Sequence, residues 1–190
     1  MRPSPALLPF GALAAAALGC SGSHPVTVLD GGACQGQSRP LQTATHVPEG
    51  TTVSYGDNPP SSGEHWPCWA TWGVAKSVLP PERWVHNLEH GGVVLLFQCQ
   101  TSDGCPNLSQ PLIDIANRAP DAPSGGHRFV VTADPNLPTN VAAVSWGFVL
   151  SEDAPNEADI DCFASAHEGQ GPEDIPDDPP QSACPQSYSE

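Results

Sequence analysis

The sequence predicts an α+β domain in which a small mixed or antiparallel sheet is packed by two to three helices and stabilised by disulfides. Three observations predict this class. The unbroken apolar run over residues 93–97, Val-Val-Leu-Leu-Phe, has the length and composition of a buried central strand. Stretches before and after this run carry the start and stop signals of helices. The seven cysteines favour disulfides in an oxidising compartment.

The first expected elements are short strands over residues 26–29 and 51–55. A helix is expected to start at Pro80-Pro81-Glu82 and to run to about His90, because proline is tolerated in the first turn and the pair Gly91-Gly92 supplies a stop. The central strand follows this stop directly.

A second helix is expected over residues 109–118, with Ser109 as its cap and Pro111 in its first turn. Strands are then expected over residues 129–132 and 141–150.

A last helix is expected to open at Asn156 and to close at Gly169. Its inward face is predicted from side chains that recur at i, i+3, i+4 and i+7. These side chains are Ile160, Phe163, Ala164 and His167. At this position a buried histidine bonded to backbone is expected.

The N-terminus has the pattern of a secretory signal. Arg2 precedes a short apolar run over residues 6–18, and small residues close the run. The sequence Ala-Leu-Gly-Cys at 17–20 resembles a bacterial lipoprotein box, in which Cys20 is lipidated and becomes the new N-terminus. The alternative is a plain signal peptide with an incidental cysteine. The expected location is the cell envelope, lipid-anchored on the periplasmic or surface side, or otherwise secreted.

These features divide the chain into four parts. They are a lipoprotein signal peptide (1–19), an N-terminal linker (20–44), a single globular domain (45–172) and an acidic, proline-rich tail (173–190).

The charge of the chain limits the classes of partner that it can bind. The formal net charge is −15. Nucleic acid and anionic membrane surfaces are therefore excluded as partners, and a membrane is expected to be reached only through the lipid. The acidic run of the tail is typical of a solvated segment.

Besides a lipidated cysteine, six cysteines remain, which suits three disulfides. Cys99 and Cys105 flank a short polar loop and are expected to form a local bridge. Cys162 is expected to pair with Cys34 or Cys184.

The strongest chemical signal is the sequence His-Asn-Leu-Glu-His at 86–90. The i, i+4 spacing puts His86 and His90 on one helix face, where they can chelate one metal ion. His65 lies in a proline-stiffened loop and is expected to complete a set of three imidazoles. Glu89 is expected beside them, either as an acceptor that orients an imidazole or as a general base, which makes it the candidate catalytic residue.

Tyr55 and Trp66 are expected to wall the site. His46 opens a polar stretch and is not expected among the ligands, and the same holds for His24 in the linker. His127 stands at a strand edge, where either role is open.

From about residue 55 to 173 the chain resembles a bacterial family catalogued as domain of unknown function 3105. The resemblance implies a common fold and a common site, but no established activity. It rests on the segments 59–66 (Pro-Pro-Ser-Ser-Gly-Glu-His-Trp), 69–73 (Trp-Ala-Thr-Trp-Gly), 85–93 (Val-His-Asn-Leu-Glu-His-Gly-Gly-Val), 145–147 (Ser-Trp-Gly) and 171–173 (Gly-Pro-Glu).

Three classes of function remain open. The first is an envelope protein that binds copper or zinc, alone or with an unknown envelope partner, since imidazole suits both ions. The second is a metal-dependent hydrolase, because residues 86–90 fit the letters of the inverted zincin motif H-x-x-E-H. The third is a non-catalytic envelope scaffold with structural histidines.

Overall fold

A computed structural model of the chain describes residues 34–119 and 128–173. Its core is a six-stranded mixed sheet with three helices, which confirms the predicted α+β class. The strands are β1 (Gln37–Ser38), β2 (Gly73–Val74), β3 (Val93–Phe97), β4 (Phe129–Ala133), β5 (Val141–Ser145) and β6 (Phe148–Glu152). The helices are α1 (Pro81–Glu89), α2 (Pro106–Arg118) and α3 (Glu157–His167).

The sheet has the strand order β1-β6-β5-β3-β4-β2. The central strand β3 pairs parallel with β4 and antiparallel with β5. A helix, α2, connects β3 to its parallel neighbour, as a parallel pair requires. At the edges, β2 is parallel to β4, whereas β1 is antiparallel to β6.

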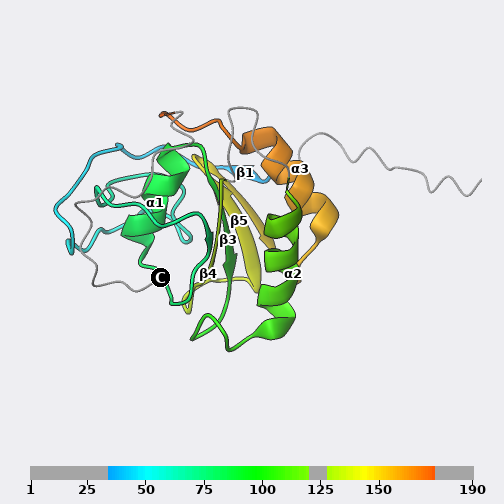
Figure 1. The fold of residues 1–190 in the computed structure, drawn as a ribbon. Coiled ribbons are helices and arrows are strands. Elements are labelled where there is room, and N and C mark those ends of the chain that lie inside the picture. The colour runs from blue at the N-terminus through cyan, green and yellow to red at the C-terminus, as the bar shows by residue number, and fades with distance from the viewer. Residues whose placement is uncertain (1–33, 120–127, 174–190) are drawn as a thin grey trace, which may run out of the picture.

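The helices cover both faces of the sheet, with α1 on one side and α2 and α3 on the other (Figure 1). Successive side chains of β3 point to opposite faces. Leu95 and Phe97 accordingly belong to the core beneath α2 and α3, and Val94 and Leu96 belong to the core beneath α1. Both faces are buried, and this explains why the strand is apolar without alternation.

Three local expectations were wrong in detail. Helix α2 begins at Pro106 instead of Ser109, because Pro106 occupies the first helical position and Pro111 lies inside the helix. The stretch 141–150 is a hairpin of β5 and β6, with Gly147 at φ 79° in the turn. Residues 51–55 form no strand. The backbone N–H of Val53 instead donates to the Glu82 carboxylate at 2.9 Å.

Two disulfides lie within the described residues, one local and one between distant parts of the chain. Cys99 and Cys105 form the expected local bridge, and Cys34 pairs with Cys162 of α3. Cys68 is disulfide-bonded too. The Cys34 bridge and strand β1 attach the stretch before residue 45 to the sheet.

Several expectations fall outside the described residues, namely the strand over 26–29, lipidation of Cys20, His24, His127 and Cys184. No helix in the described part of the chain combines the length and apolarity needed to cross a membrane.

Candidate metal centre

The last turn of α1 supplies three neighbouring polar side chains. His86 and His90 lie one turn apart, with their Nε2 atoms separated by 3.1 Å. Glu89 lies beside them, and its Oε2 atom is 3.9 Å from His86 Nε2. All three residues are buried. The negative end of the helix dipole points toward this place, which favours a bound cation.

His65 approaches the same point from the loop before α1. Its side chain is fully buried. Nδ1 lies 2.8 Å from the carbonyl oxygen of Gly63, and Nε2 lies 2.9 Å from Glu89 Oε2. The loop requires a glycine at position 63, since a Cβ there would meet the ring of Tyr55 at 3.2 Å and the backbone has φ +126°.

The protonation of two rings follows from their backbone partners. A carbonyl oxygen can only accept, so His65 Nδ1 donates to Gly63, and His86 Nδ1 donates to the carbonyl of Trp66 at 2.7 Å. We therefore assign the proton of each neutral ring to Nδ1. The Nε2 lone pair of His65 then faces Glu89 Oε2 at 2.9 Å, whereas that of His86 accepts from His90 Nε2 at 3.1 Å, with Glu89 Oε2 3.9 Å away. A backbone acceptor on the far nitrogen is the usual support of a metal-binding histidine.

His46 joins the cluster from a segment that pairs with the His65 loop. The backbone N–H of Val47 donates to the carbonyl of His65 at 2.9 Å, and the N–H of His65 donates to Thr45 at 3.1 Å. This bridge brings His46 Nε2 within 3.7 Å of Glu89 Oε2. About 50% of the His46 side chain is exposed, so this ligand faces solvent.

A salt bridge further along fixes the same segment to α1. Glu49 Oε1 lies 3.2 Å from a guanidinium nitrogen of Arg83, whose side chain is buried. The segment that carries His46 is therefore attached at two points, by backbone pairing and by this ion pair.

The ligand atoms fall into two groups that share one residue. In each group, all atoms lie within 4.8 Å of one another and could hold a metal ion. The first group is His46, His65, His86 and Glu89, and the second is Glu89, His90 and Glu173.

Glu173 comes from the segment after α3. Its backbone N–H donates to the carbonyl of Glu89 at 2.9 Å, and its carboxylate lies 3.6 Å from His90 Nε2. There is no room for a side chain at Gly171, because a Cβ there would lie 2.2 Å from the Glu89 carbonyl oxygen. The Gly-Pro-Glu sequence thus packs directly on the end of α1.

The pKa values of two residues in the first group, His86 and Glu89, are shifted by their surroundings. Burial lowers the pKa of His86 to about 3, an effect that the hydrogen bond to Trp66 only partly opposes. Burial alone would raise the pKa of Glu89, but the hydrogen bond with His65 and the neighbouring imidazoles lower it overall. At neutral pH His86 is therefore uncharged and Glu89 is ionised, the forms in which each binds a metal.

Tryptophan rings form apolar walls around the imidazoles. The ring of Trp69 lies 5.0 Å from that of His86 and 4.7 Å from that of His90, measured between centroids. Trp146 lies edge-on to His65 at 6.4 Å. The two aromatics that the sequence suggested as walls, Tyr55 and Trp66, donate to backbone carbonyls. Tyr55 donates to the carbonyl of Glu64, and Trp66 donates to that of Thr51.

The structure brings His65, His86 and Glu89 of the predicted set into one group. His90 touches His86, but its group is the one with Glu173. His46 and Glu173 were not expected as ligands. No spacing in the sequence pointed to His46, whereas Glu173 ended one of the segments used for the family resemblance and was assigned to the tail.

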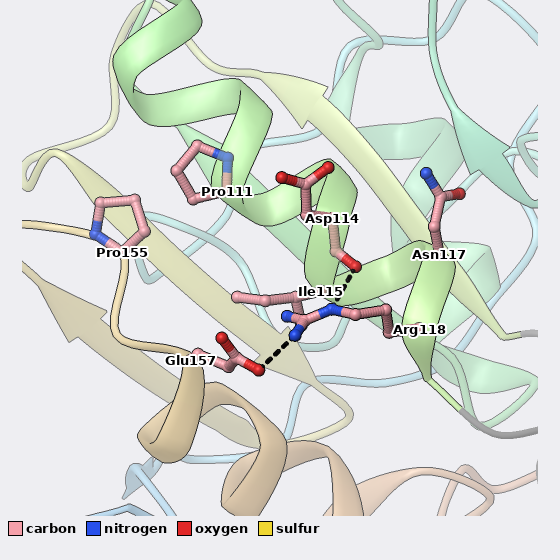
Figure 2. Close-up of a pocket in the computed structure, with 7 residues that line it drawn as sticks. All are labelled: Pro111, Asp114, Ile115, Asn117, Arg118, Pro155 and Glu157. Atoms are coloured by element: carbon pink, nitrogen blue, oxygen red, sulfur yellow. Dashed lines mark hydrogen bonds and ion pairs between the residues drawn. The ribbon is translucent and has the colours of Figure 1, made fainter.

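A well-formed pocket lies elsewhere, between α2 and the start of α3 (Figure 2). It has a volume of about 530 Å³ and contains the ion pair of Arg118 with Glu157. It holds neither histidine nor cysteine, and it carries no candidate chemistry. Its lining residues are Pro111, Asp114, Ile115, Asn117, Arg118, Pro155 and Glu157.

Fold and site together define an α+β protein with a buried histidine–carboxylate cluster that could hold a metal ion. The family model described as protein of unknown function DUF3105 matches residues 46–180, more than half of the chain, and the protein belongs to this family. Comparison with curated proteins and with solved structures finds no match.

Proposed function

We propose that the protein is an envelope metal-binding protein that holds a copper or zinc ion through His46, His65, His86 and Glu89. The observation that carries this proposal is the convergence of the imidazole Nε2 atoms on one carboxylate oxygen, while backbone carbonyls hold the Nδ1 atoms of His65 and His86. Imidazole nitrogen with one carboxylate suits both metals.

The close contacts support a cation at this point. With its Nδ1 donating to Gly63, a neutral His65 presents a lone pair to the Glu89 carboxylate, and two acceptors 2.9 Å apart need a positive species between them. A metal ion fills that need and gains further ligands, since His86 and His46 lie within reach of the same oxygen.

The hydrolase alternative has less support. Inverted zincins place both histidines and the glutamate on a long helix, whereas α1 has nine residues and ends at Glu89. The Glu89 Oε2 atom lies among the imidazole nitrogens, the position of a ligand and not of a base facing bound water. The scaffold alternative makes the cluster a buried ion-pair network without metal.

We extend the proposal to location. The apolar leader ending at Gly19-Cys20, and the disulfides of the described domain, support export and a lipid anchor on Cys20. An unmodified N-terminal peptide in mass spectrometry of protein from the native envelope would contradict the anchor without affecting the metal site.

The test of metal binding starts from protein purified without a histidine tag. Elemental analysis should find copper or zinc, and titration of the metal-free protein with Zn²⁺ should show saturable, tight binding. His65→Ala should weaken that binding at least tenfold. No saturable binding of either metal would leave the scaffold as the correct description. Hydrolysis that depends on zinc and on Glu89 would favour the enzyme.

A further inference from the structure

We infer that the centre is built for two metal ions, with Glu89 as the carboxylate between them. The second ion would be held by Glu89, His90 and Glu173, beside the first in the His46 group. This inference rests on the proposed function, since it takes the first ion as given.

The two groups are close enough to work as one centre. They share Glu89, and a carboxylate has two oxygens that can each bind one ion. They also touch through the 3.1 Å contact between His86 Nε2 and His90 Nε2. Ions in two-metal sites of proteins lie about 3.5–4 Å apart and are commonly joined in this way.

The arrangement of His86 and His90 also explains why a single ion is not bound by the residues of both groups. In the tautomer that carries its proton on Nδ1, each ring has one lone pair at Nε2 and can bind one ion. His86 lies 3.9 Å from the Glu89 oxygen that faces His65, whereas His90 lies 3.6 Å from the carboxylate of Glu173. One ion in each group gives both rings a metal to bind.

The segment that carries Glu173 is held in place by backbone contacts. The N–H of Gly169 donates to the carbonyl of Gly91 at 2.8 Å, and the N–H of Glu173 donates to Glu89 at 2.9 Å. A side chain at Gly171 would clash with the end of α1. Pro172 restricts the backbone between these contacts. The position of the Glu173 carboxylate is therefore set by the fold, although about 50% of that side chain is exposed.

The two positions differ in chemistry. The first offers three imidazoles and one carboxylate and is mostly buried, whereas the second offers one imidazole and two carboxylates. Nitrogen-rich sets favour zinc and copper over the ions that prefer oxygen, and the oxygen-rich set is less selective. The half-exposed Glu173 makes the second ion the more weakly held and the first to be lost on dialysis.

The experiment is a titration of metal-free, untagged protein with Zn²⁺, followed by native mass spectrometry and calorimetry. We expect two ions per chain, one tight and one at least tenfold weaker. Glu173→Gln should abolish the weaker stage and leave the tight ion bound. Glu64→Gln, at an exposed glutamate outside both groups, is the matched control and should retain both stages.

A second readout tests the distance directly. Two Cu²⁺ ions about 4 Å apart couple magnetically, so the doubly loaded protein should lose most of its ordinary copper resonance and show a half-field signal. Glu173→Gln should restore the spectrum of an isolated ion.

The outcomes separate the two proposals. One tight ion with no second stage overturns the two-metal inference but leaves the proposed function intact. A second stage that survives Glu173→Gln, without magnetic coupling, is an adventitious ion only and also overturns the inference. Absence of any tight ion overturns the proposed function itself.

Discussion

His65 and Glu89, which lie 24 residues apart in the sequence, are joined by a buried 2.9 Å contact between Nε2 and Oε2. His65 comes from an irregular loop and Glu89 from the last position of α1. The other ring nitrogen of His65, Nδ1, donates to the carbonyl of Gly63. The contact therefore fixes the direction of an imidazole lone pair and connects the loop to the helix.

Glu89→Gln removes the negative charge and keeps the shape of the side chain. We expect at least tenfold weaker Zn²⁺ affinity, because a carboxylate ligand shared by the cluster is lost. The measurement is competition with a chelator of known affinity, and Glu64→Gln serves as the control. Unchanged affinity together with loss of a zinc-dependent hydrolysis would instead identify Glu89 as a general base.

His46→Ala should separate metal binding from stability. Half of this side chain is exposed, so we expect a loss of stability within about 1 kcal/mol, but at least a tenfold loss of Zn²⁺ affinity. His167→Ala is the matched control. His167 Nε2 donates to the carbonyl of Gln35 at 2.8 Å and its ring stacks on Phe148, and the residue belongs to neither ligand group.

The His167→Ala control should give the opposite pattern, with lower stability and unchanged Zn²⁺ affinity. Equal affinity in wild type and His46→Ala would remove His46 from the ligand set and leave the first group with only His65, His86 and Glu89, which the sequence predicted.

The elements with continuous periodicity were predictable from the sequence. Helix α1 begins and ends within a residue of its expected limits, because Pro81 and the glycine pair act locally. The strand over residues 93–97 was predictable from composition alone. The inward face of α3 was also predictable, and so was the hydrogen bond of His167 to a backbone carbonyl. In each case the signal lies within the element itself.

The parts that depend on tertiary pairing were not predictable. His46 reaches the site only because Val47 and Thr45 pair with the backbone of His65. The sequence around His46 carries no signal that predicts this pairing. Glu173 reaches it because Gly171 allows close packing on α1. The division of the cluster into two groups depends on distances of a few ångströms between side chains, which sequence spacing does not determine.

Gly171→Ala should disturb the end of α1. The new Cβ would lie 2.2 Å from the Glu89 carbonyl oxygen and 2.3 Å from the nitrogen of Gly91. Backbone atoms on both sides leave no room to adjust, so we expect a loss of about 1–3 kcal/mol in the free energy of unfolding, measured with urea. Gly56→Ala is the control, since the nearest contact there is at 3.8 Å. Similar stability of the two variants would show that the 171–173 segment is not packed as described.

The stability of the metal-free protein should fall as the pH falls from 6.5 toward 3. Burial lowers the pKa of His86 from 6.5 to about 3, so over this range the unfolded chain binds a proton that the folded protein excludes. The full decrease in the free energy of unfolding that this ring causes is roughly 3–5 kcal/mol at most. The lowered pKa of Glu89 acts in the same direction below its ordinary value of 4.5.

Thermal unfolding at several pH values checks this expectation, and His86→Gln should flatten the slope. Glu152 provides a contrast, because burial raises its pKa to about 7. Its contribution to stability is complete below 4.5 and is lost as the pH rises through about 7, so Glu152→Gln should alter the neutral side of the profile and leave the acid side unchanged. A profile for His86→Gln that is parallel to wild type at acid pH would contradict the burial of a neutral ring.

The disulfides yield the last prediction. Cys34 and Cys162 are 128 residues apart, whereas Cys99 and Cys105 are six apart. Loop-closure entropy assigns about 5 kcal/mol to the long loop and about 2 kcal/mol to the short one. Replacing the first pair by alanine should therefore destabilise the protein more than replacing the second pair, as measured by urea unfolding under oxidising conditions.

Cys68 is the remaining bonded cysteine of the described chain, and Cys20 and Cys184 are the two cysteines still to be assigned. We expect non-reducing peptide mapping to join Cys68 to Cys184, because a thioether-linked lipid would use the thiol of Cys20. A bridge between Cys68 and Cys20 would exclude the lipid anchor. The same map, made on protein from the native envelope, thus decides the third disulfide and the attachment to the membrane together.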